Sequence, residues 1–293
     1  MELKSGLEWD HSAVETVLLA VRRARDVARA SRPLSRGHLA VAIGILRGAG
    51  AGRSRESGRD ARATFRDDAT LPVFYTIHLR TDRSFIPGPA GELEALLEWD
   101  PQIAALATAL ICHPHPVYGG TMHNKVVFRA AKAALAAGLP TLRFNFRGAG
   151  KSAGTFDEGN GEREDVRAAL NHLAERFPNL PIVLVGFSFG AWVGLAVGAN
   201  DQRVTALVGL GLPVDSHDCS FLRQAAKPKL IIQGTHDQYG SRQRVEELYA
   251  SLAQPKQIHW VEGADHFFAG HLPEVQEVLS GFLRKESSES RSA

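Results

Sequence analysis

This chain contains few cysteines, carries a small net charge and lacks long apolar runs. Only Cys112 and Cys219 occur in 293 residues, which excludes a disulfide framework and is typical of a reducing compartment. The formal net charge of +2 gives no indication of a nucleic-acid partner. No apolar run approaches the roughly 20 residues needed to span a bilayer, and 39–46 is too short and too far from Met1 for an ordinary signal peptide. We therefore predict a cytoplasmic protein without a membrane span.

The first seventy residues differ in composition from the rest. They hold 13 Lys and Arg residues, twelve of them Arg, against 9 Asp and Glu. We predict a poorly ordered Arg/Ala-rich extension over 1–70, a catalytic domain over 71–284 and a disordered tail over 285–293. Two alternatives stay open for the extension: a basic amphipathic helix near residues 12–30, or sequence upstream of a true start near residue 70.

Apolar segments of strand length alternate with helical patterns from residue 71 onward. Such alternation predicts an α/β fold with a mostly parallel eight-stranded sheet and helices on both faces. In such sheets, ligands bind where loops leave the carboxyl ends of the strands. The predicted strands are 73–79, 93–99, 106–112, 141–146, 182–186, 204–210, 229–233 and 257–261. The predicted helices are 124–137, 162–176, one that follows Gly190, 241–252 and 273–283.

A Gly-Phe-Ser-Phe-Gly stretch stands between the strand at 182–186 and the next helix. This G-x-S-x-G pattern, from Gly186 to Gly190, is typical of a nucleophile elbow, in which a tight turn exposes the serine hydroxyl. The two glycines allow strand and helix to approach closely around the bend. Ser188 is therefore the candidate nucleophile.

A serine nucleophile needs a base and an acid that orients the base. In a sheet enzyme of this kind the order along the chain is Ser, Asp or Glu, then His. Asp237 follows the strand at 229–233 and His266 follows the last strand, so both are expected at the sheet edge that carries Ser188. Rival acids are Asp215, Asp218 and Asp265. Rival bases are His217, His236, His259 and His271.

The oxyanion hole should combine the amide of the residue after the serine with an amide from an earlier strand-end loop. Phe189 supplies the first. The loop beginning at His113 supplies the second, and Pro114 and Pro116 are excluded because proline has no N–H. The backbone N–H groups of Phe189 and His115 are the predicted donors.

Four segments together resemble the α/β-hydrolase superfamily, most closely a capless, dienelactone-hydrolase-like branch of bacterial hydrolases. They are His113–Val127, Arg143–Gly154, Gly186–Gly190 and Gly263–Phe268. The resemblance covers residues 71 to about 284 and implies a serine hydrolase whose triad is Ser188, Asp237 and His266. The sequence departs from the pattern at Gly234–Gly240, because similar proteins often carry a hydrophobic-Pro pair after the acid.

Two other patterns suggest different chemistry. Residues 148–153 match G-x-G-x-x-A after a strand, but further glycines delay the helix that a dinucleotide site needs. We interpret this loop as a glycine-rich wall beside the active site. His113, His115 and His123 lack a spacing typical of metal ligands. We predict no cofactor and no metal.

The connection from Pro213 to Pro228 is too short for a cap domain, which predicts an open site. We expect a serine esterase that acts on a small-molecule ester with a short or medium acyl chain. The same triad would serve a thioester, lactone or amide, and a non-catalytic binding protein on this fold is the alternative from another class. The sequence does not indicate an oligomeric state.

Overall fold

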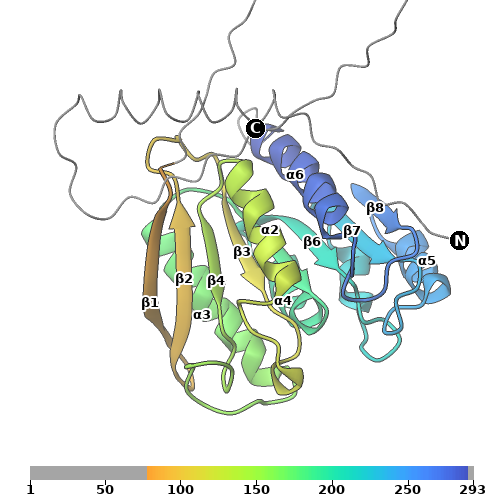
Figure 1. The fold of residues 1–293 in the computed structure, drawn as a ribbon, viewed down its shortest axis with the longest axis horizontal. Helices are drawn as coiled ribbons and strands as arrows, with labels where there is room; N and C mark the ends of the chain where they lie inside the picture. Colours follow the sequence, from red (N-terminus) through yellow and green to blue (C-terminus); the bar gives the residue numbers. More distant parts are fainter. Residues whose placement is uncertain (1–77, 290–293) are drawn as a thin grey trace, which may run out of the picture. The chain divides into compact units, whose positions relative to one another are not determined.

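A computed structural model describes residues 78–289 and forms an eight-stranded sheet with helices on both faces (Figure 1). The strand order is β1-β2-β4-β3-β5-β6-β7-β8. β1 and β2 run antiparallel to their neighbours, whereas the pairs from β4 to β8 are parallel. The strands are β1 (Arg80–Gly88), β2 (Gly91–Trp99), β3 (Thr108–Cys112), β4 (Thr141–Phe144), β5 (Ile182–Phe187), β6 (Val204–Leu210), β7 (Lys229–Gly234) and β8 (Lys256–Val261). The predicted fold class is confirmed.

The central strand β5 shows why both faces of the sheet are covered. All of its residues are buried, and alternate side chains enter two separate apolar cores. Leu184 packs into the core under helices α3 (Asn160–Arg176), α4 (Phe189–Asn200) and α5 (Arg242–Ser251). Val185 packs into the core under α2 (Lys125–Ala136) and α6 (Leu272–Glu289), which lie together on the other face (Figure 1). The continuous apolar run of β5 therefore contributes side chains to both cores.

The predicted helices agree with the structure apart from their ends. The Asn124 side chain accepts a hydrogen bond from the Val126 N–H and so fixes the start of α2. Helix α6 continues to Glu289, past residue 284, where the catalytic domain was predicted to end. The predicted 1–70 extension lies outside the described residues.

The first strand differs from the prediction. Most of the predicted strand at 73–79 lies outside the described residues, and His78 and Leu79 are not in a strand. Instead, β1 occupies the sheet edge and extends through Pro87 to Gly88. Only Ile86 is buried in β1. A polar edge strand that ends with a proline lacks the apolar alternation on which strand prediction depends.

No domain-sized insertion covers the carboxyl ends of the described strands. Residues 211–228 join β6 to β7 and contain a single short 3-10 helix, Ser220–Gln224. Within residues 78–289 no helix has the length and apolar character needed to cross a membrane. Cys112 and Cys219 are both buried and free.

Candidate active site

Ser188 occupies a strained turn between β5 and α4. Its φ of 55° and ψ of −122° lie where few non-glycine residues occur. The Ser188 N–H donates to the Leu210 carbonyl of β6 at 2.9 Å, which fixes the turn to the neighbouring strand. A Cβ on Gly186 would lie 2.4 Å from the Ala191 Cα, and one on Gly190 would lie 2.4 Å from the His113 carbonyl oxygen. Glycine is required at both positions by close approach of the backbone.

Ser188, His266 and Asp237 form one hydrogen-bonded chain. His266 Nε2 lies 2.8 Å from Ser188 Oγ, and His266 Nδ1 lies 3.0 and 2.9 Å from the two Asp237 carboxylate oxygens. A carboxylate accepts hydrogen bonds, so Nδ1 carries the ring proton and Nε2 accepts the Ser188 hydroxyl hydrogen. The His266 ring packs between Phe187, at 5.2 Å, and Tyr239, at 4.7 Å. These contacts hold the imidazole edge toward the serine.

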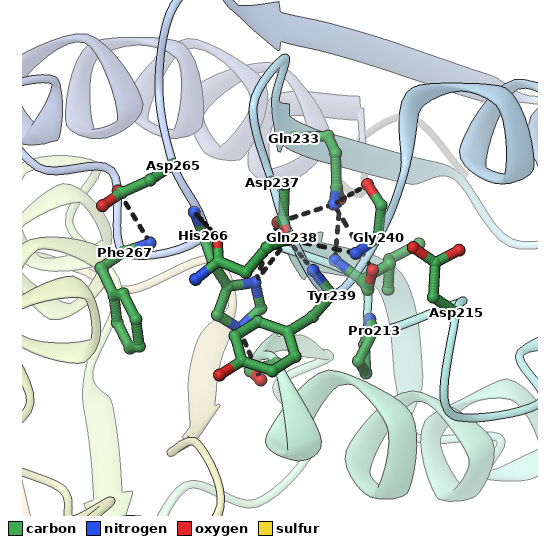
Figure 2. A network of polar contacts seen from close by, with 12 residues as sticks. Pro213, Asp215, Gln233, Asp237, Gln238, Tyr239, Gly240, Asp265, His266 and Phe267 are labelled. Atoms are coloured by element: carbon green, nitrogen blue, oxygen red, sulfur yellow. Dashed lines mark hydrogen bonds and ion pairs between the residues drawn. The ribbon is translucent and has the colours of Figure 1, made fainter.

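The Asp237 carboxylate is fixed by donors other than His266 (Figure 2). The N–H groups of Tyr239 and Gly240 donate to Oδ1 at 2.8 and 3.1 Å, and Gln233 Nε2 donates to Oδ2 at 2.8 Å. The side-chain Oε1 of Gln233 also accepts from the Leu212 N–H at 2.8 Å. Gln233 therefore joins the acid to the loop after β6. The sequence analysis did not identify it, because it resembles the polar end of a strand.

The rival acids have other partners. Asp215 accepts from the N–H and hydroxyl of Ser241 and lies 3.7 Å from Arg244. Asp218 accepts from Ser220, and Asp265 accepts from the N–H groups of Phe267 and Ala269. None of these carboxylates contacts His266 among the hydrogen bonds of residues 78–289.

Among the hydrogen bonds of residues 78–289, none joins a rival base to the Ser188 hydroxyl. His259 Nε2 lies 2.8 Å from Glu274, and His271 lies 3.8 Å from the same carboxylate. His236 is exposed. His217 Nδ1 lies 2.8 Å from Ser216 Oγ.

The two predicted oxyanion donors line one cavity with Ser188. Within residues 78–289, neither the Phe189 N–H nor the His115 N–H has a hydrogen-bond acceptor, although other amides of the same loop do. The Gly120 N–H, for example, donates to the His115 carbonyl at 3.0 Å. The two rings stack at 4.8 Å, so the residues lie side by side. Both amides remain available to a ligand.

His113 anchors the oxyanion loop from beneath. Its side chain is 0% exposed, Nδ1 lies 2.6 Å from the Pro114 carbonyl, and the Phe146 N–H donates to Nε2 at 2.9 Å. Nδ1 must therefore carry the proton, and the ring is neutral. Burial lowers its pKa from 6.5 to about 4, although the bond to Pro114 acts in the opposite direction. This anchoring role was not predicted from the sequence, in which His113 marks the start of the oxyanion loop and one of three histidines considered as metal ligands.

The glycine-rich loop after β4 is not part of the cavity wall. Its predicted role beside the active site is therefore wrong in detail, because none of residues 148–154 lines the cavity. The loop instead leads to Phe156, whose ring packs 4.8 Å from His115 and 5.8 Å from Phe189. Helix α3 begins only at Asn160. Among residues 78–289, no three His, Cys, Asp or Glu side chains are arranged to hold a metal.

The cavity at Ser188 has a volume of about 350 Å³. Its aromatic and imidazole side chains come from four strand-end loops and from the first residue of α4. No Asp, Glu, Lys or Arg is among the residues that line it. They are Pro114, His115, Tyr118, Gly119, Gly120, Asn124, Ser188, Phe189, Pro213, Ser216, His217, Tyr239, His266 and Phe267.

Comparison with known proteins identifies the family of the chain. Residues 108–277 match the family model described as an alpha/beta hydrolase domain. An uncharacterised protein of Rickettsia prowazekii is 36% identical over 209 residues, which cover 68% of this chain and 87% of that protein.

Solved structures show the same likeness. An α/β serine hydrolase homologue from Coxiella burnetii is 42% identical with a TM-score of 0.65, covering 69% of this chain and 97% of that one. A serine hydrolase without a lid from Xanthomonas campestris is 34% identical with a TM-score of 0.65, covering 70% and 94% of the two chains. Est1E from Butyrivibrio proteoclasticus, at 15% identity and a TM-score of 0.59 over 70% of this chain and 99% of that one, shares the fold.

Proposed function

Since the chain belongs to the α/β-hydrolase family and its capless branch, we propose that it is a serine hydrolase that cleaves carboxylic esters with short or medium acyl chains. The observation that carries the proposal is the hydrogen-bonded chain from Asp237 through His266 to Ser188 at the wall of an open cavity. That geometry supports the predicted roles of all three residues.

Acylation begins at the Ser188 hydroxyl. Its oxygen forms a bond to the ester carbonyl carbon as His266 Nε2 takes the hydroxyl proton, and the carbonyl oxygen becomes an oxyanion. The unpaired N–H groups of Phe189 and His115 donate to that oxyanion. The tetrahedral intermediate then collapses, and His266 returns the proton to the departing alcohol oxygen. Asp237 holds the imidazolium in place throughout.

Deacylation repeats these steps with water. His266 Nε2 removes a proton from the water, whose oxygen bonds to the acyl carbon, and the proton then passes to Ser188 Oγ as the acid departs. The same chemistry would serve a thioester, lactone or amide.

The cavity supports the choice of a small, uncharged ester. A volume of about 350 Å³ is near the lower end of small-molecule sites, which span roughly 300–1,000 Å³. A charged substrate would find no ionised carboxylate, ammonium or guanidinium group among the lining residues. Tyr118, Tyr239 and Phe267 are 85%, 46% and 49% exposed around the cavity and offer apolar contact surface.

Replacing Ser188 with alanine tests the proposal directly. The Ser188→Ala variant should lose hydrolysis of 4-nitrophenyl acetate and butyrate and should no longer react with a fluorophosphonate probe. In the wild type, peptide mapping should place the probe on Ser188 and not on Ser216, the other serine of the cavity. Ser251→Ala, on α5 outside the cavity, is the matched control. Unchanged turnover in Ser188→Ala, or a wild type that the probe does not label, would refute the assignment.

A further inference from the structure

Two histidines that have no part in the triad face the catalytic cavity. His115 comes from the loop after β3, and His217 comes from the connection between β6 and β7. Aromatic neighbours fix both rings: His115 packs 4.8 Å from Phe189, and His217 packs 4.4 Å from Trp192. The two imidazoles are near enough for a charge on His217 to lower the pKa of His115. They are rigid, close to each other and beside Ser188.

Each ring keeps one nitrogen for a ligand. His115 Nδ1 is buried without a partner, whereas Nε2 is accessible and has no hydrogen bond within residues 78–289. An N–H without an acceptor is costly when buried, so the proton resides on Nε2. The Ser216 hydroxyl lies 2.8 Å from His217 Nδ1 and 3.4 Å from the Pro213 carbonyl oxygen. Because the contact with Nδ1 is the shorter, we assign the hydroxyl hydrogen to Nδ1, which places the ring proton on Nε2. Both accessible nitrogens are therefore donors.

The direction of proton transfer divides the cavity. His266 must reach the oxygen of the departing alcohol, so the alcohol part lies on the His266 side, where Tyr239 and Phe267 flank the imidazole at 4.7 and 5.3 Å. A second group of packed rings is separate from those around His266: Phe189 packs against His115 and Trp192, and Trp192 packs against His217. This second group forms the wall that faces the acyl part. An acyl chain that extends from Ser188 along this wall meets two imidazole donors.

We propose that His115 and His217 form a subsite for a neutral hydrogen-bond acceptor in the acyl chain, so that esters of oxo acids are preferred over esters of plain fatty acids. This subsite rests on the proposed esterase function. Burial lowers the pKa of both histidines. The Glu162 carboxylate raises the pKa of His115, but this effect is smaller than that of burial. Both rings are neutral at pH 7.5 and favour a ketone oxygen over a carboxylate.

The test compares matched pairs of substrates at pH 7.5. The 4-nitrophenyl esters of 4-oxopentanoate, 5-oxohexanoate and 6-oxoheptanoate are measured against those of pentanoate, hexanoate and heptanoate. At the length that reaches the imidazoles, the oxo ester should have the higher kcat/KM, by roughly 2- to 12-fold for each net hydrogen bond. His217→Phe and His115→Phe keep a ring of similar size without nitrogens and should remove that preference. His172→Phe, on α3 outside the cavity, should keep it.

The outcomes separate the subsite from the esterase activity. Equal kcat/KM within every pair, or an oxo preference that survives in His217→Phe, would overturn the subsite and leave the esterase proposal intact. If a monoester of glutarate has a higher kcat/KM than the 5-oxohexanoate ester, the subsite binds an anion, and the proposal of a neutral acceptor is overturned. Absence of any Ser188-dependent hydrolysis would overturn both proposals.

Discussion

Acid should destabilise this protein through His113. Protonation of the ring would place a second N–H on Nε2, which faces the Phe146 N–H donor at 2.9 Å inside a fully buried site. Protonation of His113 is therefore less favourable in the folded state than in the unfolded chain, and burial lowers the pKa of His113 to about 4. Between pH 6.5 and 4 the unfolded state binds more protons, so the free energy of unfolding falls as the pH falls.

The magnitude follows from the two pKa values. The interval from 6.5 to about 4, at about 1.36 kcal/mol per pH unit, corresponds to about 3 kcal/mol. This stability is present above pH 6.5 and is lost as the pH falls toward 4. It is a large part of the 5–15 kcal/mol that is typical of folded domains.

Urea unfolding of the wild type and of His113→Gln, at several pH values from 7.5 to 4.5, isolates the effect. Glutamine can donate and accept but does not titrate, so the difference in unfolding free energy between the two proteins should change by about 2–3 kcal/mol across this range. Contributions from all other titrating groups cancel in that difference. His123→Gln, at an exposed histidine, controls for removal of an imidazole. Parallel pH dependences for wild type and His113→Gln would refute the reasoning.

Three further substitutions probe the site. Asp237→Asn should lower kcat in an ester assay on the order of 10⁴-fold, whereas Asp215→Asn should not, because Asp215 does not contact the base. An equal loss of kcat in the two variants would contradict the choice of acid. Gln233→Leu should cost about 1–3 kcal/mol in urea unfolding and lower kcat more than KM, because Asp237, Leu212 and Gly240 lose their hydrogen bonds to its side chain; a stability equal to wild type would speak against this. Gly190→Ala should cost about 1–3 kcal/mol and most of the activity, since a Cβ there would lie 2.5 Å from the Cys112 carbonyl; an unchanged Tm with full kcat would show that the elbow tolerates it.

Local constraints explain what could be predicted from the sequence. Ser188 stands between two glycines whose Cβ positions are occupied by backbone atoms, and such a constraint is visible in five residues. Asp237 and His266 follow apolar strands in the required order, and parallel strands bring their carboxyl ends to one edge. The strand order along the chain and the positions of these three side chains could therefore be predicted from short sequence patterns.

The missed features depend on distant partners. His113 bonds to Phe146, 33 positions away, and Gln233 bonds to Leu212, 21 positions away. Neither pairing leaves a periodic signal, because a buried polar side chain is satisfied by whichever backbone group the fold brings near. Strand β1 was missed for the opposite reason, since only one of its nine residues is buried.

The acid loop shows how a departure from the family pattern can preserve geometry. A hydrophobic-Pro pair often follows the acid in similar proteins, whereas this chain has Gln238, Tyr239 and Gly240. Here the N–H groups of Tyr239 and Gly240 both donate to Asp237 Oδ1, and a proline at either position would remove one of these donors. Tyr239 also places its ring 4.7 Å from His266. In this chain the acid loop therefore supplies two backbone donors to the carboxylate and an aromatic contact to the imidazole, and these contacts orient the base toward Ser188.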